Sequence, residues 1–231
     1  GSEMCIRDSY IAECNLTPRA KRNIARYLDH SIVYYASWMD KYRDTPEFRN
    51  VEHVSYVDAD MQLVDTLRKG KTNCVVELMH AIDRLKDYRN MSDSLVRLNL
   101  MYVIHIVGDM HCPSHVKYPG CKSGRADLNG KKMSYHAMWD WGVLDGAHGW
   151  SYSEYRLLLD TFSKREKAGM AKGTPREWLY ETAVACRVIY DWQRADGTYG
   201  KQFVTDTYLL PERQLILASY RLAAVLNDLF G

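Results

Sequence analysis

Apolar side chains recur at helical spacing along most of the 231-residue chain, whereas the alternating pattern of strands is weak. Thr17-Pro18 is typical of a helix start, with a capping hydroxyl before a proline, and predicts a helix to about Leu28. Further helices are predicted at 32–42, 74–88, 95–110, 136–140, 153–165, 175–194 and 211–230. The predicted fold class is all-α, a single-domain multi-helix bundle of roughly seven or eight helices.

Two stretches interrupt this helical pattern. Residues 44–57 mix proline with polar residues, and residues 119–132 are rich in Gly, Lys and Asn, so an irregular connection and a loop are predicted there. No repeat, low-complexity tract or linker divides the chain, and we expect residues 10–231 to form one domain. Residues 1–9, GSEMCIRDS, begin like a cloning scar and are expected to be a tag or a non-native start.

Composition and charge narrow the class of protein. Hydrophobic residues make up 46% of the chain, which indicates a globular protein rather than a disordered one. The net charge of +2 is too balanced for a protein that wraps nucleic acid with massed Lys and Arg. No apolar run reaches about eighteen residues, so no membrane span is expected.

The six cysteines have no zinc-finger spacing. Cys112 and Cys121 flank a loop and either form a disulfide or remain free thiols, two alternatives between which the sequence does not decide.

The strongest chemical signal lies between His105 and Asp140. Two pairs, His105 with Asp109 and His136 with Asp140, have members four residues apart, which places both members on one helix face. His115 stands between the pairs, after a proline at which the first helix is expected to have ended. Imidazoles and carboxylates in so short a span are the ligands that zinc uses in proteins. The stretch therefore predicts a zinc site, with plain helix-surface residues as the alternative.

Further residues along the chain extend this pattern to one that resembles a known family. In order they are Trp38-Met39-Asp40, His53, His105-Ile-Val-Gly-Asp109 with His115, Ser134-Tyr135-His136-Ala-Met-Trp139-Asp140 and Ser219-Tyr220-Arg221-Leu222-Ala223. Their order and inner spacings resemble the zinc-dependent single-strand nucleases of the S1/P1 type, which share the phospholipase C/P1 nuclease fold. The resemblance runs from about Tyr10 to the end of the chain.

The resemblance implies zinc ions held by residues of these motifs. The first zinc would be held by Asp40, His53, His105 and Asp109, and the second by His115, His136 and Asp140. A third zinc in the family takes an N-terminal Trp, a nearby His and the bridging carboxylate that is Asp109 here. Residues 1–9 contain neither Trp nor His, and the place of that His falls near Cys5. The motifs thus support two zinc sites, and the third lacks its N-terminal ligands. A thiolate binds zinc, but we interpret the placement of Cys5 as coincidental.

The implied activity is that of a zinc-dependent phosphodiesterase, an endonuclease that prefers single-stranded DNA and RNA. It would release 5′-nucleotides and also accept 3′-phosphomonoesters. Asp40 is expected to orient the attacking water, and Arg43 to bind a phosphate oxygen unless it is an ordinary surface residue. Single-stranded nucleic acid or nucleotides are the expected partners, and secretion or export to a periplasm is the localisation that the resemblance implies. His111 and His148 match no ligand position and are expected to be structural.

Two other functions remain as alternatives. A zinc phospholipase C would have the same fold, but its last carboxylate is typically Glu, where this chain has Asp140. A non-catalytic, metal-stabilised binding protein would explain the missing third-zinc ligands. The aromatic residue that stacks the base in some members of the family is Val54 here, with Tyr56 as a substitute or as a packed core residue.

Overall fold

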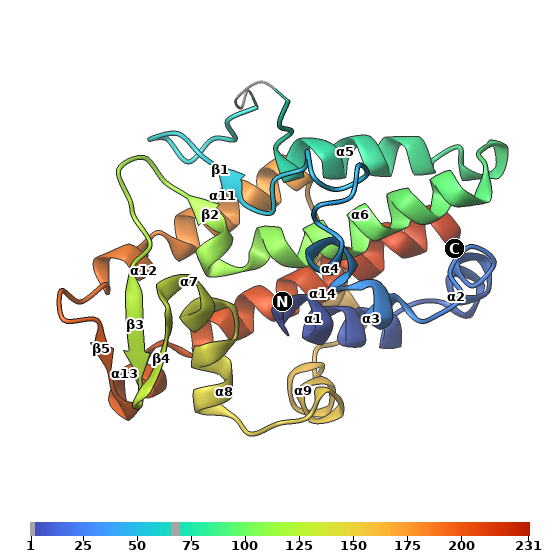
Figure 1. Cartoon of the computed structure of the whole chain (residues 1–231). Helices are drawn as coiled ribbons and strands as arrows, with labels where there is room; N and C mark the ends of the chain where they lie inside the picture. The colour runs from blue at the N-terminus through green and yellow to red at the C-terminus, as the bar shows by residue number, and fades with distance from the viewer. Residues whose placement is uncertain (1–2, 66–69) are drawn as a thin grey trace.

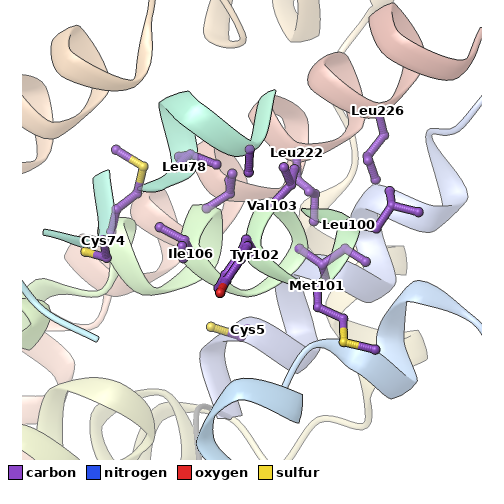
Figure 2. Close-up of a cluster of buried hydrophobic side chains, with 14 of the residues drawn as sticks. Cys5, Cys74, Leu78, Leu100, Met101, Tyr102, Val103, Ile106, Leu222 and Leu226 are labelled. Atoms are coloured by element: carbon purple, nitrogen blue, oxygen red, sulfur yellow. The ribbon is translucent and has the colours of Figure 1, made fainter. Parts of the chain in front are cut away.

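The long helix α6 (Asp93–His111) runs through the middle of the molecule (Figure 1). Its side chains are buried without a break from Asn99 to His111, as expected for a helix enclosed on all sides. The computed structural model, which describes residues 3–65 and 70–231, places α5 (Cys74–Leu85), α14 (Leu209–Phe230) and α1 (Glu3–Cys14) against it. Figure 2 shows Leu78 of α5, Val103 of α6 and Leu222 of α14 gathered in one cluster of buried side chains.

Three short helices follow α1; the first packs against α14, and the other two pack against α6. They are α2 (Pro18–Ile24), α3 (Ile32–Tyr35) and α4 (Trp38–Lys41). Thr17 caps α2 by accepting a hydrogen bond from the backbone of Ala20, as predicted from the Thr-Pro pair. The single helix predicted over 32–42 is wrong, because the chain turns at Ala36 and Ser37 and divides it into α3 and α4.

Further helices precede α14 in the C-terminal part of the chain. They are α9 (Tyr152–Leu159), α10 (Lys164–Met170), α11 (Pro175–Cys186), α12 (Val188–Asp191) and α13 (Lys201–Thr207). The helix predicted over 153–165 is split, because Ser163 starts a new helix with a capping box to Glu166. In the same way, the helix predicted over 175–194 is divided at Arg187.

Two small sheets accompany the helices. β1 (Ser55–Tyr56) pairs in parallel with β2 (Val116–Lys117), and β3 (Arg125–Leu128) lies between β4 (Lys131–Ser134) and β5 (Thr198–Tyr199). The expectation of a loop throughout 119–132 is therefore wrong. Asn129 and Gly130 take positive φ values of 52° and 84°, and they close a two-residue β3–β4 hairpin turn, for which Asn-Gly is the favoured sequence.

The remaining short elements precede or follow α6 along the chain. After the 3₁₀ turn η1 (Tyr88–Asn90), α6 runs to His111, and the 3₁₀ turn η2 (Pro113–His115) follows at once. Then come α7 (Tyr135–Ala137), a π-helical turn η3 (Met138–Gly142) and α8 (Val143–Ala147). Among the described residues, no helix combines the length and the apolarity that crossing a membrane requires.

A buried arginine ties four of the helices together. Arg221 of α14 donates a hydrogen bond of 2.8 Å from Nη1 to Nε2 of His111 and another of 3.2 Å from Nε to the Met170 carbonyl. Its Nη2 pairs with Glu181 of α11, and its guanidinium lies over the ring of Trp178. Arg221, which belongs to the Ser219–Ala223 motif of the family resemblance, therefore holds helices together in the interior of the fold.

Residues 3–9, which we expected to belong to a tag or a non-native start, form the first part of α1 and pack among α6 and α14. Gly1 and Ser2, the beginning of that segment, lie outside the described residues. Whether residues 1–9 are native stays a prediction.

Candidate metal centre

Helix α6 presents His105 and Asp109 on one face, as their spacing predicts. His105 Nε2 lies 2.8 Å from Asp109 Oδ2, and both side chains are buried. On the other side of the ring, His105 Nδ1 lies 2.6 Å from the carbonyl oxygen of Ala36, the residue at which α3 ends. Donation of the Nδ1 proton to that carbonyl leaves a lone pair on Nε2, which is the form of imidazole that binds a metal.

His53 and Asp40 reach the same point from the N-terminal third of the chain. His53 Nδ1 lies 3.0 Å from His105 Nε2, 3.3 Å from Asp40 Oδ1 and 3.4 Å from Asp109 Oδ2. Asp40 comes from α4, whereas His53 comes from the connection just before β1. All four side chains that the resemblance assigns to a first zinc therefore meet at one place, which we call the first ligand group (Asp40, His53, His105, Asp109).

His115 lies beside the first ligand group because the chain breaks at the end of α6. Pro113 begins the η2 turn, and β2 then pairs with β1 so that Val116 lies opposite Ser55. His115 accordingly donates from Nδ1 to the carbonyl of His53 at 2.9 Å. The same Nδ1 lies 3.4 Å from Asp109 Oδ1.

The remaining predicted ligands lie next to His115 and form with it the second ligand group (His115, His136, Asp140). The rings of His115 and His136 stack with centroids 4.6 Å apart. Ligand atoms of His115, Asp140 and Cys112 lie within 4.8 Å of one another. His136 belongs to α7 and Asp140 to η3, so the short helix predicted for this pair has a π-helical turn in its middle. Such turns occur often at functional sites.

The second ligand group opens into a cavity of about 450 Å³, which we call the metal-side cavity. Its lining consists of Ser37, Asp40, Lys41, Arg43, His115, His136, Ala137, Asp140 and Trp141. The two residues predicted to act on the substrate, Asp40 and Arg43, both lie here. Among the described residues that form the lining, Val54 and Tyr56 are absent.

Sequence reasoning missed four of these lining residues, Ser37, Lys41, Ala137 and Trp141, of which Lys41 and Trp141 bring a charge and an aromatic ring to the cavity. Each of these two follows directly after a predicted zinc ligand, Asp40 or Asp140, and that adjacency was the available signal.

Burial and neighbouring charges shift the pKa values of the ligands in different directions. Burial lowers the pKa of His105, but the Asp109 carboxylate outweighs this effect and raises the value to about 9. In the same way, Asp109 raises the pKa of His115 well above its ordinary value, so a metal ion has to displace a proton from each ring.

Burial, helped by the charges of His115 and Lys117, lowers the pKa of His136 to about 4, so its ring is neutral at pH 7. Burial also raises the pKa of Asp140 to about 6, against the opposing effect of His115. For Asp109, burial is outweighed by the charges of His105 and His115, which hold its pKa well below the ordinary range.

The donor atoms fit a zinc ion in both chemistry and spacing. Two ligands bound tetrahedrally at 2.0–2.1 Å from zinc lie about 3.3 Å apart. The distances within the first ligand group run from 2.8 to 3.4 Å. Asp109 Oδ2 and His115 Nε2 are also buried without a hydrogen-bond partner among the described residues, a costly arrangement that a cation relieves.

Cys5 stands near the position at which the family resemblance places a histidine ligand of the third zinc. Its Sγ lies 3.2 Å from Asp109 Oδ1 and 3.5 Å from the His105 carbonyl. Ligand atoms of Cys5, His105 and Asp109 lie within 4.8 Å of one another. The helix α1 thus brings Cys5 to the first ligand group, and whether this placement is coincidental stays untested.

The two other histidines mentioned above lie outside both ligand groups. His111 donates from Nδ1 to the Val107 carbonyl at 2.7 Å and accepts from Arg221 through Nε2 at 2.8 Å, so both ring nitrogens are used within the protein. His148 pairs with Glu212 and stacks on Trp150 with ring centroids 3.6 Å apart. These contacts agree with a structural role for both residues.

The fold and the site together define a class: an all-α protein in which imidazoles and carboxylates converge beside a cavity, as in metal-dependent hydrolases. The sequence profile of the S1/P1 nuclease family matches residues 8–231, and the chain belongs to that family. The all-α fold and the resemblance predicted from the sequence are thereby confirmed.

Individual relatives agree with this membership. Endonuclease 4 of Arabidopsis thaliana is 23% identical over 98% of this chain and 86% of its own length. Endonuclease 2 of the same plant is 27% identical over 70% of this chain and 63% of its own length. Nuclease S1 of Aspergillus oryzae is 28% identical over 62% of this chain and 53% of its own length. The family and these names support a nuclease, a hydrolase that acts on phosphodiester bonds.

Proposed function

We propose that the chain is a zinc-dependent endonuclease that prefers single-stranded DNA and RNA, releases 5′-nucleotides and also removes 3′-phosphates. The observation that carries the proposal is the convergence of the first ligand group, with donor atoms 2.8 to 3.4 Å apart at the centre of the fold. Membership of a nuclease family supports the phosphodiester as the bond that is cleaved.

Two zinc ions form the basis of the proposal. The first ligand group would hold one, the second ligand group would hold the other, and Asp109 lies within 3.4 Å of His115 between them. When bound, zinc supplies a Lewis acid that polarises a phosphoryl oxygen and lowers the pKa of water toward neutrality. Cys5 and Asp109 are the described groups nearest to a third ion, and the proposal does not depend on them.

The side chains around the metal-side cavity would bind and orient the reactants. Arg43 can bind two non-bridging phosphate oxygens through its planar guanidinium, and Lys41 adds a second positive charge to the same wall. Asp40 would accept a hydrogen bond from the attacking water and so orient it toward phosphorus. Two cationic side chains thus line the cavity beside the carboxylates of Asp40 and Asp140, and bound zinc ions would supply the further positive charge that a polyanionic substrate requires.

The size of the metal-side cavity supports the proposed preference for single strands. A volume of about 450 Å³ is in the range of small-molecule sites and accepts one nucleotide. A base that is paired and stacked in a duplex has to be splayed out before its nucleotide can enter, which costs a few kcal/mol. An unpaired strand does not require this step.

Secretion, or export to a periplasm, completes the proposal and rests on the resemblance alone. Detection of the mature protein in the culture medium or the periplasmic fraction, and its absence from the cytosol, would support it.

The test compares substrates on metal-depleted and zinc-loaded protein. Zinc-loaded protein should cleave single-stranded DNA and RNA faster than duplex DNA, leave 5′-phosphate ends, and release phosphate from a 3′-nucleotide. Chelation with EDTA should abolish these activities, and added zinc should restore them. Release of diacylglycerol from phosphatidylcholine without nucleotide release would instead identify a phospholipase C. No hydrolysis of any of these substrates by zinc-loaded protein would identify a metal-stabilised binding protein.

A further inference from the structure

Two neighbouring tryptophans of the η3 turn have different surroundings. Trp139 is buried in the core, where it stacks on Trp192 and contacts Phe203 edge to face. Trp141 is half-buried and lines the metal-side cavity together with His136 and Asp140. Core packing therefore explains the first indole, whereas the second lies beside the candidate metal ligands.

A lysine holds one face of this second indole. Lys131 is exposed and places its Nζ 4.3 Å from the ring centroid of Trp141, within the range of a cation–π interaction. The β3–β4 hairpin positions Lys131, because the Asn129-Gly130 turn makes it the first residue of β4, opposite Leu128. The ring is thus restrained on one side by a positively charged residue.

We propose that Trp141 is the platform on which the base of the bound nucleotide stacks, on the face that Lys131 leaves open. The occupant to which we commit is a nucleobase, and this inference rests on the proposed nuclease function. Three features support it: an indole in the cavity wall, the phosphate-binding candidates Lys41 and Arg43 in the same wall, and the adjacent ligand Asp140. Aromatic side chains stack on any base, so the platform would bind bases with little sequence preference.

The proposal also accounts for a departure from the family pattern. Val54 stands where some members have a stacking aromatic, and among the described lining residues of the metal-side cavity neither Val54 nor Tyr56 is found. Trp141 supplies an aromatic surface from another part of the sequence: it directly follows Asp140 of the second ligand group, whereas Val54 directly follows His53 of the first.

Binding of two small ligands isolates the contribution of the base. Zinc-loaded protein is titrated calorimetrically with adenosine 5′-monophosphate and with ribose 5-phosphate, which has the same phosphate and sugar but no base. The wild-type protein should bind the nucleotide at least about tenfold more tightly, as expected from one base–aromatic stack. Trp141→Ala should remove this preference, and Trp141→Phe should keep most of it. Lys131→Gln should weaken it by only about two- to threefold.

Trp150→Ala is the matched control, because Trp150 is another half-buried indole and stacks on His148 away from the metal-side cavity. It should leave the preference unchanged. With single-stranded DNA, Trp141→Ala should raise KM about tenfold and change kcat less than about threefold, since stacking is uniform binding. Zinc content and the thermal midpoint report whether each variant is folded.

The outcomes separate this inference from the proposed function. If wild-type protein cleaves single-stranded DNA but Trp141→Ala keeps the preference for the nucleotide, the platform is wrong and the nuclease stands. If zinc-loaded wild-type protein neither cleaves DNA nor binds either ligand, both the nuclease and the platform are overturned.

Discussion

Asp109 and His115 connect the two ligand groups across the break at the end of α6. One carboxylate oxygen of Asp109, Oδ1, lies 3.4 Å from His115 Nδ1, and the other, Oδ2, lies 2.8 Å from His105 Nε2. The carboxylate therefore spans from the first ligand group to the second. Asp109 is thus an assigned ligand of the first group and also a neighbour of the His115 nitrogen that points away from the second ion, so we expect both sites to respond when its charge is removed.

Asp109→Asn should reduce zinc content and activity together. The amide keeps the shape of the carboxylate but removes the negative charge that faces the rings of His105 and His115. We expect the zinc content to fall by at least about half and hydrolysis of single-stranded DNA to fall by at least about a hundredfold. Metal analysis and a nuclease assay on the same preparation measure both effects.

Asp83→Asn is the matched control for this change, since Asp83 is an exposed carboxylate on α5 that pairs with Lys86. It should retain full zinc and full activity. Retention of zinc and activity by Asp109→Asn would mean that the carboxylate is not shared between the ligand groups.

Arg43→Ala should separate substrate binding from metal binding. Because Arg43 lines the metal-side cavity without belonging to either ligand group, its loss should raise KM about tenfold and leave zinc content unchanged. Steady-state kinetics with a single-stranded oligonucleotide measure the change, and exposed Arg89→Ala serves as the control. An unchanged KM would mean that Arg43 does not bind the substrate and is an ordinary surface residue, the alternative that the sequence left open.

Arg221→Met should destabilise the fold rather than the chemistry. The variant leaves His111 Nε2 without its donor and removes the guanidinium from Trp178, in a place where Arg221 is 2% exposed. We expect a loss of about 3 kcal/mol in the free energy of unfolding, measured by urea denaturation. Arg213→Met, on the exposed side of the same helix, should change it by less than about 0.5 kcal/mol. Equal losses of unfolding free energy in the two variants would contradict a stabilising role for the buried contacts of Arg221.

Thiol labelling should distinguish the cysteines and decide the disulfide alternative. All six are free thiols in the structure, Cys112 and Cys121 included. Burial raises the pKa of Cys74 to about 12, so it stays protonated and unreactive toward iodoacetamide at pH 8, whereas exposed Cys14 reacts. In protein that is denatured without reduction, mass spectrometry should find every cysteine labelled. Protection of Cys112 and Cys121 alone would reveal a disulfide between them.

The ligand groups could be predicted from the sequence because part of their geometry is local. His105 and Asp109 share a helix face through their spacing, and the apolar run around them predicts a buried helix with Ser92 at its start. The meeting of His53 with His105 is not local. It depends on the β1–β2 pairing and on the turn after α6. His53 could therefore be assigned as a ligand only through the family resemblance, not from a local sequence pattern.

The β3–β4 hairpin and the cavity could not be predicted in the same way. The Gly, Lys and Asn content of 119–132 favours a loop, and the Asn129-Gly130 turn signal within it was outweighed. The contact of Lys131 with Trp141 then depends on where this hairpin lies relative to η3, which no local pattern encodes. The helix breaks at Ser37 and Ser163 show the same limit, since apolar spacing continues across them.

Zinc content per chain tests the central claim most directly. Protein purified without chelators and dialysed against metal-free buffer should contain about two zinc ions per chain by inductively coupled plasma mass spectrometry, one for each ligand group. Fewer than about one zinc per chain, with no uptake on addition of zinc, would contradict the assignment of these His and Asp residues as a metal centre.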